Sequence, residues 1–227
     1  MSEPNPQTLT LAMAPAEFID SDHPAIVAFA RDRAGEGQPT DQAIRLYYAV
    51  RDELRYDPYN FSVDRDFLKA SATLINGSGY CVPKAALLTA CARAVGIPAR
   101  IGFADVRNHL ASERLLKLMG TNIFYYHGYT ELWLDGAWRK ATPAFNIELC
   151  ERFGVKPLEF DGRADALMHE FDQSGRQHME YLADHGARLD IPHAELSQAY
   201  QQHYPRLLGF EGQINGDMAA EMEAERK

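Results

Sequence analysis

The stretch NGSGYCVPKAALLTACARAVGIPAR, residues 76–100, decides the fold of this chain. Its glycine-rich opening predicts a turn, and the apolar run that follows predicts a helix from about Val82 to Val95 that stops at Gly96. Cys81 stands where this helix begins. Because the first N–H groups of a helix have no intrahelical partner and carry the positive end of its dipole, a thiol there ionises more readily than a free one. Cys81 is therefore a candidate nucleophile, with a small buried packing residue as the alternative.

Elements on either side of this helix predict an α+β fold. Apolar spacing and turn signals place helices at about 23–34, 41–54, 66–72, 111–119, 164–183 and 192–208, and extended segments at 98–106, 123–134 and 137–141. The pair Asp135-Gly136 between two aromatic-rich runs is a strong hairpin signal, so the last two segments predict antiparallel strands. This order of elements favours a helix packed on an antiparallel sheet, with further helices toward both termini.

The length bounds the domain organisation. A chain of 227 residues can bury one substantial core, so we expect a single domain over residues 1–227 with its core at about 40–146. We expect residues 147–210 to form a C-terminal helical extension and residues 211–227 to form a flexible tail. The extension could cap a cleft or provide the contact of a homodimer.

The composition excludes several classes of protein. A net charge of -9 without a basic run argues against nucleic acid or an anionic membrane as the main partner. Three cysteines at irregular spacing match neither a disulfide framework nor a zinc site. The first residues lack the pattern of a secretion signal, and no apolar stretch is long enough to cross a bilayer. We therefore expect a reduced cytoplasmic protein.

Five histidines in the C-terminal half suggest a metal hypothesis, which their spacing disfavours. They are His169, His178, His185, His193 and His203. His178 and His185 would lie two turns apart on one helix, too far for adjacent ligands. We expect no metal and no cofactor.

A cysteine nucleophile needs a base, and histidine is the natural base near neutral pH. Among the eight histidines, His127 stands out because it lies in a predicted strand and is followed by Gly128, which leaves room for another backbone or a substrate. His109 is the second choice. A half-buried structural histidine is the alternative interpretation of His127.

Two blocks of this sequence resemble the transglutaminase-like superfamily of papain-like thiol enzymes. The first, GYCVPKAALLTACARAVGIPAR, is similar to the nucleophile helix of the family, with a G-x-C turn and an R-x-x-G-I-P-A-R ending. The second, HGYTELWLDGAWRKATPA, is similar to the family's histidine strand, which is followed by a glutamate, a turn and a tryptophan strand. The blocks occur in the family's order, and the resemblance covers roughly residues 45–146. It implies a papain/transglutaminase-like core in which Cys81 is the nucleophile and His127 the base.

The third catalytic position departs from the family's pattern, because Thr142 stands where the family usually has aspartate. A carboxylate fixes the histidine tautomer and stabilises the imidazolium, whereas a threonine hydroxyl offers no charge. Asn146 lies close by and could act as asparagine does in papain-like enzymes. Our hypothesis is that Thr142 or Asn146 orients His127; the alternative is that one ends a strand and the other forms a turn.

Two carboxylates and two further side chains of this region need an interpretation. Asp105, at the end of an extended segment, is the remaining carboxylate candidate for orienting the histidine. Glu131 shares a strand face with His127 but lies about 13 Å away by strand rise. We interpret Lys84 as a solvated lysine, with a role in lowering the thiol pKa as the alternative. Cys91 is interpreted as inert packing.

Stabilisation of an oxyanion needs hydrogen-bond donors beside the nucleophile. The backbone N–H of Cys81 suits this role, and Tyr56 or Asn76 could supply a second donor. Tyr80, next to the nucleophile, could instead form a wall of the substrate cleft.

The resemblance implies an enzyme that acts on an amide or related acyl bond through a thioester acyl-enzyme. Cys81 would attack a carbonyl carbon, and His127 would pass the proton to the leaving amine. We favour a peptidase or amidase whose partner is a peptide, a protein or a small amide. The alternatives are transfer of the acyl group to an amine and a non-catalytic binding module that retains the fold.

Overall fold

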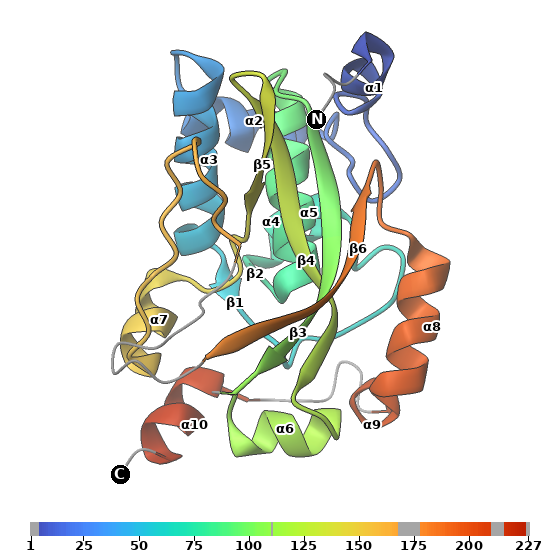
Figure 1. Cartoon of the computed structure of the whole chain (residues 1–227), viewed down its shortest axis with the longest axis vertical. Helices are drawn as coiled ribbons and strands as arrows, with labels where there is room; N and C mark the ends of the chain where they lie inside the picture. The colour runs from blue at the N-terminus through green and yellow to red at the C-terminus, as the bar shows by residue number, and fades with distance from the viewer. Residues whose placement is uncertain (1–4, 110, 168–177, 210–215, 226–227) are drawn as a thin grey trace.

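The computed structural model describes residues 5–109, 111–167, 178–209 and 216–225 (Figure 1). Its helices are α1 (Pro6–Leu11), α2 (Pro24–Ala34), α3 (Pro39–Glu53), α4 (Ala70–Asn76), α5 (Cys81–Ala94), α6 (Glu113–Met119), α7 (Ile147–Phe153), α8 (His193–His203), α9 (Pro205–Leu208) and α10 (Met218–Glu225). Its strands are β1 (Arg55–Tyr56), β2 (Ser78–Gly79), β3 (Ala99–Asn108), β4 (Ile123–Leu134), β5 (Ala137–Ala141) and β6 (Met179–Arg188). The predicted α+β class, with helices toward both termini, is confirmed.

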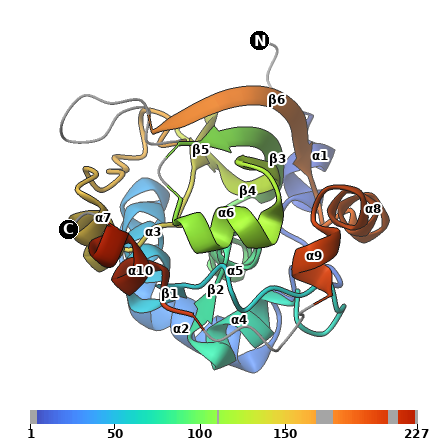
Figure 2. The same ribbon diagram turned by 90° about the horizontal axis from the view of Figure 1, so that it is seen from below.

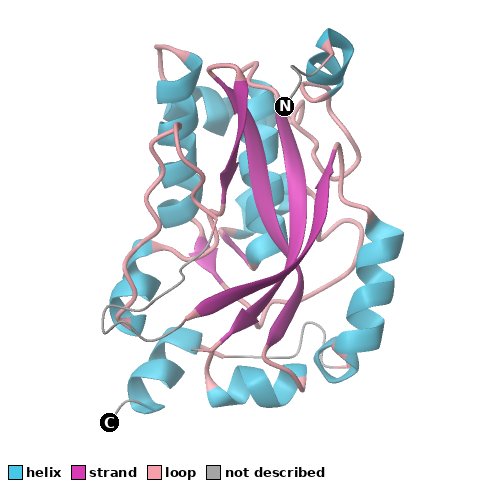
Figure 3. Ribbon diagram, viewed as in Figure 1, coloured by secondary structure: helices cyan, strands magenta, loops and turns pink. Residues whose placement is uncertain are grey.

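One antiparallel sheet and one central helix organise the molecule. The strands run in the order β5-β4-β3-β6, and each neighbouring pair is antiparallel (Figures 1 and 3). α5 packs against β4 and β3, while α2, α3 and α4 cover the side of α5 that faces away from the sheet (Figure 2). β1 and β2 form a short parallel pair just before α5 begins.

Helix α5 is buried on all sides. Every residue from Cys81 to Arg93 is buried, as a helix without a polar face requires. Lys84 is no exception, because its Nζ donates to the carbonyl oxygens of Arg51 at 2.8 Å and Leu54 at 2.5 Å. The interpretation of Lys84 as a solvated lysine is therefore wrong: the carbonyls at the C-terminal end of α3 take the place of water. Burial lowers the pKa of Lys84 to about 7.

The hairpin between β4 and β5 forms as its sequence predicts. Leu134 pairs with Ala137, and the two residues between them have positive φ, 48° at Asp135 and 81° at Gly136. Positive φ at both central residues is the turn that matches the twist of a hairpin. The register then continues to Thr130 and Ala141 without a break.

The prediction of a helix over residues 164–183 is wrong at both of its described ends. Residues 164–167 are not helical, and Ala166 forms a β-bridge with Ala141. Residues 179–188 form β6, which pairs with β3 from Asn108↔Met179 to Ile101↔Arg188. Met, Glu, Leu and Ala in this stretch favour helix locally, but the open edge of β3 offers a full ladder of hydrogen bonds. Tertiary pairing therefore outweighs local propensity. Residues 168–177 of the predicted helix lie outside the described residues.

The prediction of a flexible tail over residues 211–227 is also wrong for residues 218–225, which form α10. Met218 of this helix is buried, and Glu221 accepts hydrogen bonds from the hydroxyls of Tyr59 and Ser112 and pairs with Arg114. The partners of Glu221 lie 107 to 162 residues earlier in the chain, so the tail sequence alone does not reveal these contacts. Residues 211–215, 226 and 227 lie outside the described part.

Candidate active site

Cys81 is the first residue of α5 and is nearly buried, with 6% of its surface exposed. Tyr80, in an extended conformation, is the N-cap residue, and the β1-β2 pair carries the chain into this turn. Pro83 fits the first turn because the N–H it lacks would have no intrahelical partner there. The predicted position of Cys81 at the mouth of the central helix is therefore what the structure shows.

The backbone of β4 passes directly against the start of α5 at Gly128. A Cβ placed on Gly128 would lie 2.8 Å from the Cα of Val82 and 3.2 Å from the carbonyl oxygen of Cys81. Only glycine permits this approach, and the residue before it is His127. The sequence blocks that carry the candidate nucleophile and the candidate base thus meet in space.

His127 is buried and lies opposite Ala104 of β3. Gly128 faces α5, as does Thr130, whose hydroxyl donates to the carbonyl oxygen of Ala85. His127 directly precedes Gly128, so its backbone lies beside the contact between β4 and the start of α5.

The surroundings of the Cys81 thiol favour its neutral form. Burial raises its pKa to about 11, and hydrogen bonds from the backbone N–H groups of Gly128, Val82 and Cys81 itself offset only part of this effect. The expectation that the helix start makes the free thiol acidic is outweighed by desolvation. Cys91, deeper in α5, is buried as expected, and burial raises its pKa further.

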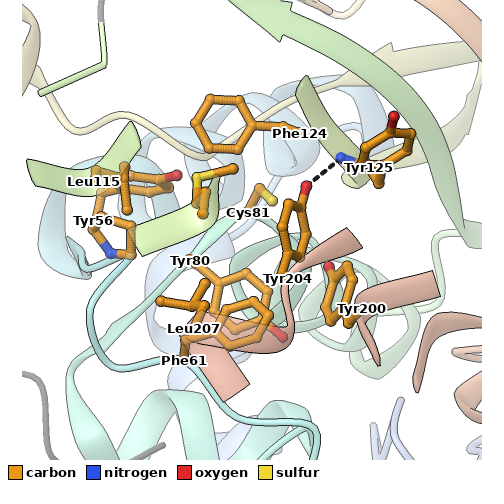
Figure 4. A pocket seen from close by; sticks show the side chains of 12 residues that line it. Tyr56, Phe61, Tyr80, Cys81, Leu115, Phe124, Tyr125, Tyr200, Tyr204 and Leu207 are labelled. Carbon is orange, nitrogen blue, oxygen red and sulfur yellow. Dashed lines mark hydrogen bonds between the residues drawn. The ribbon is translucent and has the colours of Figure 1, made fainter. Parts of the chain in front are cut away.

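An apolar cavity adjoins Cys81 (Figure 4). Its volume is about 30 Å³, room for about one or two water molecules. The residues that line it with Cys81 are predominantly aromatic or aliphatic: Tyr56, Pro58, Phe61, Tyr80, Leu115, Met119, Phe124, Tyr125, Tyr200, Tyr204 and Leu207. The surroundings of the thiol are therefore nearly dry.

Two of the predicted substrate or oxyanion residues, Tyr56 and Tyr80, line this cavity. The hydroxyl of Tyr80 donates to the carbonyl oxygen of Ser62 at 3.1 Å, and the ring of Tyr56 packs edge-on against Phe145. Asn76, the last residue of α4, is exposed and does not belong to the cavity lining.

Helices α8 and α9 close the cavity. The sequence predicted that the C-terminal extension could cap a cleft, but it did not identify the residues that do so. Tyr204 donates from its hydroxyl to the carbonyl oxygen of Ile123 at 2.9 Å, and the same oxygen accepts the N–H of Tyr125. In Figure 4 this hydroxyl and the Cys81 sulfur point toward the same space. The four-residue spacing of Tyr200 and Tyr204 was the available signal, because it places both rings on one face of α8 and its C-cap.

Thr142 and Asn146 hydrogen bond to residues other than His127. The Thr142 hydroxyl donates to the carbonyl oxygen of Leu167 at 2.7 Å. The side-chain oxygen of Asn146 accepts the N–H of Tyr56 at 3.2 Å, and Asn146 is also the N-cap residue of α7. Both residues therefore have hydrogen-bond partners other than the imidazole, and neither lines the cavity at Cys81.

The remaining charged candidates occupy different places. Asp105 accepts hydrogen bonds from His185 and from the N–H of Tyr126, the residue directly before the candidate base His127. Glu131 forms an ion pair with Arg100. The second-choice base, His109, has about a third of its side chain exposed, with its Nε2 3.7 Å from Glu180.

Within the described residues, no three His, Cys, Asp or Glu side chains gather closely enough to hold a metal ion. His169 lies outside this part of the chain. The described helices also include none that is both long enough and apolar enough to cross a membrane.

A thiol at the start of a central helix, beside a histidine strand of an antiparallel sheet, defines a class of papain-like architectures. Residues 27–143 match the family described as the transglutaminase-like superfamily. The chain belongs to this superfamily, which places it broadly among thiol enzymes. No curated protein matches the sequence.

Two solved structures resemble the chain at low identity. A "putative cysteine protease from Cytophaga hutchinsonii" is 15% identical, with a TM-score of 0.47, and the match covers 81% of this chain and 55% of that one. A "putative protease from Parabacteroides distasonis ATCC 8503" is 16% identical, with a TM-score of 0.40, and the match covers 59% of this chain and 25% of that one. The chain thus spans about half of the first protein and a quarter of the second, and neither likeness carries an argument about activity.

Proposed function

We propose that this protein is a cysteine-dependent peptidase or amidase that works through a thioester acyl-enzyme. The observation that carries the proposal is the contact of Gly128 with the start of α5, which joins the Cys81 turn to the His127 strand at an apolar cavity. A thiol nucleophile needs a base nearby, and this contact brings the strand of His127 to the turn that carries Cys81.

The reaction begins from a neutral thiol, because burial raises the pKa of Cys81 to about 11. His127 takes the proton as the sulfur attacks the carbonyl carbon, and the backbone N–H of Cys81 stabilises the oxyanion. The C–N bond then breaks, and His127 gives the proton to the leaving amine. Water, deprotonated by the same imidazole, attacks the thioester and releases the acid with the free thiol.

In this proposal Thr142 and Asn146 have a supporting part, since neither lines the cavity and each ties one segment of the chain to another. Thr142 ties the end of β5 to Leu167, and Asn146 ties α7 to Tyr56, which lines the cavity. With threonine in place of the family's aspartate, the imidazolium gains no charge partner from that position.

The substrate that fits this site has an apolar or aromatic group next to the scissile carbonyl. The cavity beside Cys81 is lined by aromatic rings and aliphatic side chains, so burying an apolar group there has a favourable transfer free energy, whereas burying an unpaired charge is costly. The cavity is too small for such a group while Tyr200 and Tyr204 lie in it. Substrate entry therefore requires α8 and α9 to move outward.

The test uses two chromogenic amides, the p-nitroanilides of acetyl-phenylalanine and of acetyl-aspartate. The intact protein should release p-nitroaniline from the first faster than from the second, and Cys81→Ala should abolish release. Cys91→Ala is the matched control, because it removes a second buried thiol from the same helix and should leave turnover of the folded protein unchanged. Equal release by wild type and Cys81→Ala would favour the non-catalytic binding module.

A fluorescent primary amine, added together with the phenylalanine amide, separates hydrolysis from acyl transfer. Hydrolysis gives acetyl-phenylalanine as the only acyl product. Appearance of the fluorescent amide in its place would favour acyl transfer, which a water-poor cavity also supports.

A further inference from the structure

The backbone immediately before His127 is irregular. Tyr126 has φ of 54°, in the left-handed region that a bulky residue rarely adopts. Among the described non-glycine residues, only Asp135 shares a positive φ, and the hairpin turn accounts for that one. Tyr126 lies inside β4, where no turn requires such a conformation. Another contact must therefore hold it.

A carboxylate and a histidine hold this peptide in place. Oδ1 of Asp105 accepts the Tyr126 N–H at 3.0 Å and lies 2.8 Å from Nε2 of His185. The ring of His185 stacks on the ring of Tyr126, with centroids 4.3 Å apart and planes 9° from parallel. The three residues come from β3, β4 and β6, and none of them lines the cavity at Cys81.

The register of β3 shifts at the same place in its pairing with β4 and in its pairing with β6. The β3-β4 register shifts between Ala104 and Val106, and the β3-β6 register shifts on each side of the Ala104-Asp105 pair. His127 lies opposite Ala104, at the first regular pair beyond the shift. Bulges of this kind aim a side chain differently from a regular strand and recur beside active sites.

We propose that Asp105 and His185 are positioning residues for His127. Asp105 fixes the Tyr126 peptide through its N–H, and His185 holds both the carboxylate and the Tyr126 ring, so together they set the direction in which the next residue leaves the backbone. The inference rests on the proposed function, in which His127 is the base. In this proposal Asp105 acts by holding the Tyr126 peptide, and it does not bond to the imidazole of His127 directly.

The experiment compares Asp105→Ala, Asp105→Asn and His185→Ala in the full chain. Asp105→Asn keeps an oxygen that accepts the Tyr126 N–H, so it should restore most of what Asp105→Ala loses. The control is Asp190→Ala, which removes another carboxylate that accepts backbone N–H groups, from Glu17, Phe18 and Ile19, outside the cavity lining.

With acetyl-phenylalanine p-nitroanilide, Asp105→Ala and His185→Ala should lower kcat by about 10- to 100-fold, the penalty for a misplaced catalytic group, with KM within about twofold. Asp190→Ala should lower Tm and leave kcat of the folded protein unchanged. A kcat in Asp105→Ala equal to that of wild type would overturn the positioning role.

Two spectroscopic measurements decide the inference without turnover. The three-bond coupling between the amide and α protons of Tyr126 reports its φ, and the ring Cε1–H resonance of His127 reports the surroundings of the imidazole. The Tyr126 coupling constant and the His127 chemical shift should both change in Asp105→Ala and His185→Ala, and neither should change in Asp190→Ala. If neither moves, the inference is wrong even when Cys81-dependent release establishes the proposed function; if release is absent, the proposed function fails while these signals still decide the geometry.

Discussion

The two halves of β4 belong to one strand but differ in almost every structural respect. The regular half, Tyr129–Leu134, pairs with β3 without a break from Tyr129 to Leu132 and with β5 from Thr130 onward. The irregular half, Ile123–Tyr126, pairs with β3 across a register shift and contains a residue at positive φ. Two of its backbone groups form hydrogen bonds with the Tyr204 hydroxyl. The regular half holds the sheet on α5, and the irregular half shapes the surroundings of the candidate base.

The difference indicates that one half of β4 mainly stabilises the fold and the other mainly positions the candidate base. His127 and Gly128 stand between the two halves, so the candidate base is anchored by a regular ladder on one side and aimed by an irregular segment on the other. Changes in the regular half should therefore alter the free energy of unfolding with little effect on acylation of the folded protein. Changes in the irregular half should do the reverse.

The largest expected effect comes from the boundary itself. In Gly128→Ala the new Cβ would meet the Cα of Val82 at 2.8 Å, so β4 must retreat from α5. We expect the free energy of unfolding to fall by about 3 kcal/mol, together with a loss of Cys81-dependent acylation. Urea unfolding measures the first and p-nitroaniline release the second. Gly209→Ala, with no contact under 3.4 Å, is the control and should change stability by less than about 0.5 kcal/mol.

The next effect tests the cover of the irregular half. Tyr204→Ala should admit water to the cavity, so the pKa of Cys81 should fall from about 11 toward its ordinary value. A lower pKa means more thiolate at a given pH, and alkylation by iodoacetamide at about pH 8 should become faster by a factor on the order of a hundred.

Alkylation followed by peptide mass spectrometry across a pH series measures this rate. Cys91 is the internal control, because it lies deep in α5 and should remain unlabelled in both proteins. An unchanged midpoint for Cys81 would show that α8 and α9 do not control its solvation.

A smaller effect is expected in the regular half. A Cβ on Gly102 would lie 2.2 Å from the ring of Tyr129, which is buried and bonded to Asp184. Gly102→Ala should cost about 2 kcal/mol of stability because the ring must move, while kcat of the folded protein stays the same. In the double variant with Tyr129→Ala, the added cost of Gly102→Ala should vanish. A fall in kcat equal to that of Asp105→Ala would abolish the distinction between the halves.

The smallest effect concerns one hydroxyl. Tyr204→Phe keeps the ring but removes the bonds to the Ile123 carbonyl and the Tyr125 N–H, so stability should fall by about 1 kcal/mol. Thermal unfolding measures this change, and p-nitroaniline release should rise as α9 opens more easily. Slower release would mean that the hydroxyl takes part in the reaction.

The elements that the sequence predicted well have their signals within a short stretch of chain. The turn, helix and stop around Cys81 are local, and so is the Asp135-Gly136 hairpin, whose strands end where expected. The family resemblance added the pairing of the Cys81 and His127 blocks, and the backbone contact at Gly128 agrees with it.

The elements that escaped prediction depend on partners far along the chain. β6 exists because β3 offers an edge, and the Asp105–His185 contact spans 80 residues. Tyr204 reaches backbone groups of β4 from 79 and 81 residues away. Local patterns do not encode such partners. The spacing of Tyr200 and Tyr204 indicates a shared helix face but not what that face covers, and composition and periodicity assigned helix to residues 164–167 and 179–183.

The double role of the Tyr204 hydroxyl has a consequence for how the cleft opens. One oxygen satisfies both a backbone acceptor and a backbone donor, and leaving either of them bare in an apolar site would carry a desolvation penalty. An extended polypeptide offers the same pair of groups from its own main chain. Opening of the cavity without a ligand should therefore be unfavourable. An extended peptide backbone that replaced the phenol would keep both hydrogen bonds, so we predict that ligands with amide linkages are favoured over ligands without them.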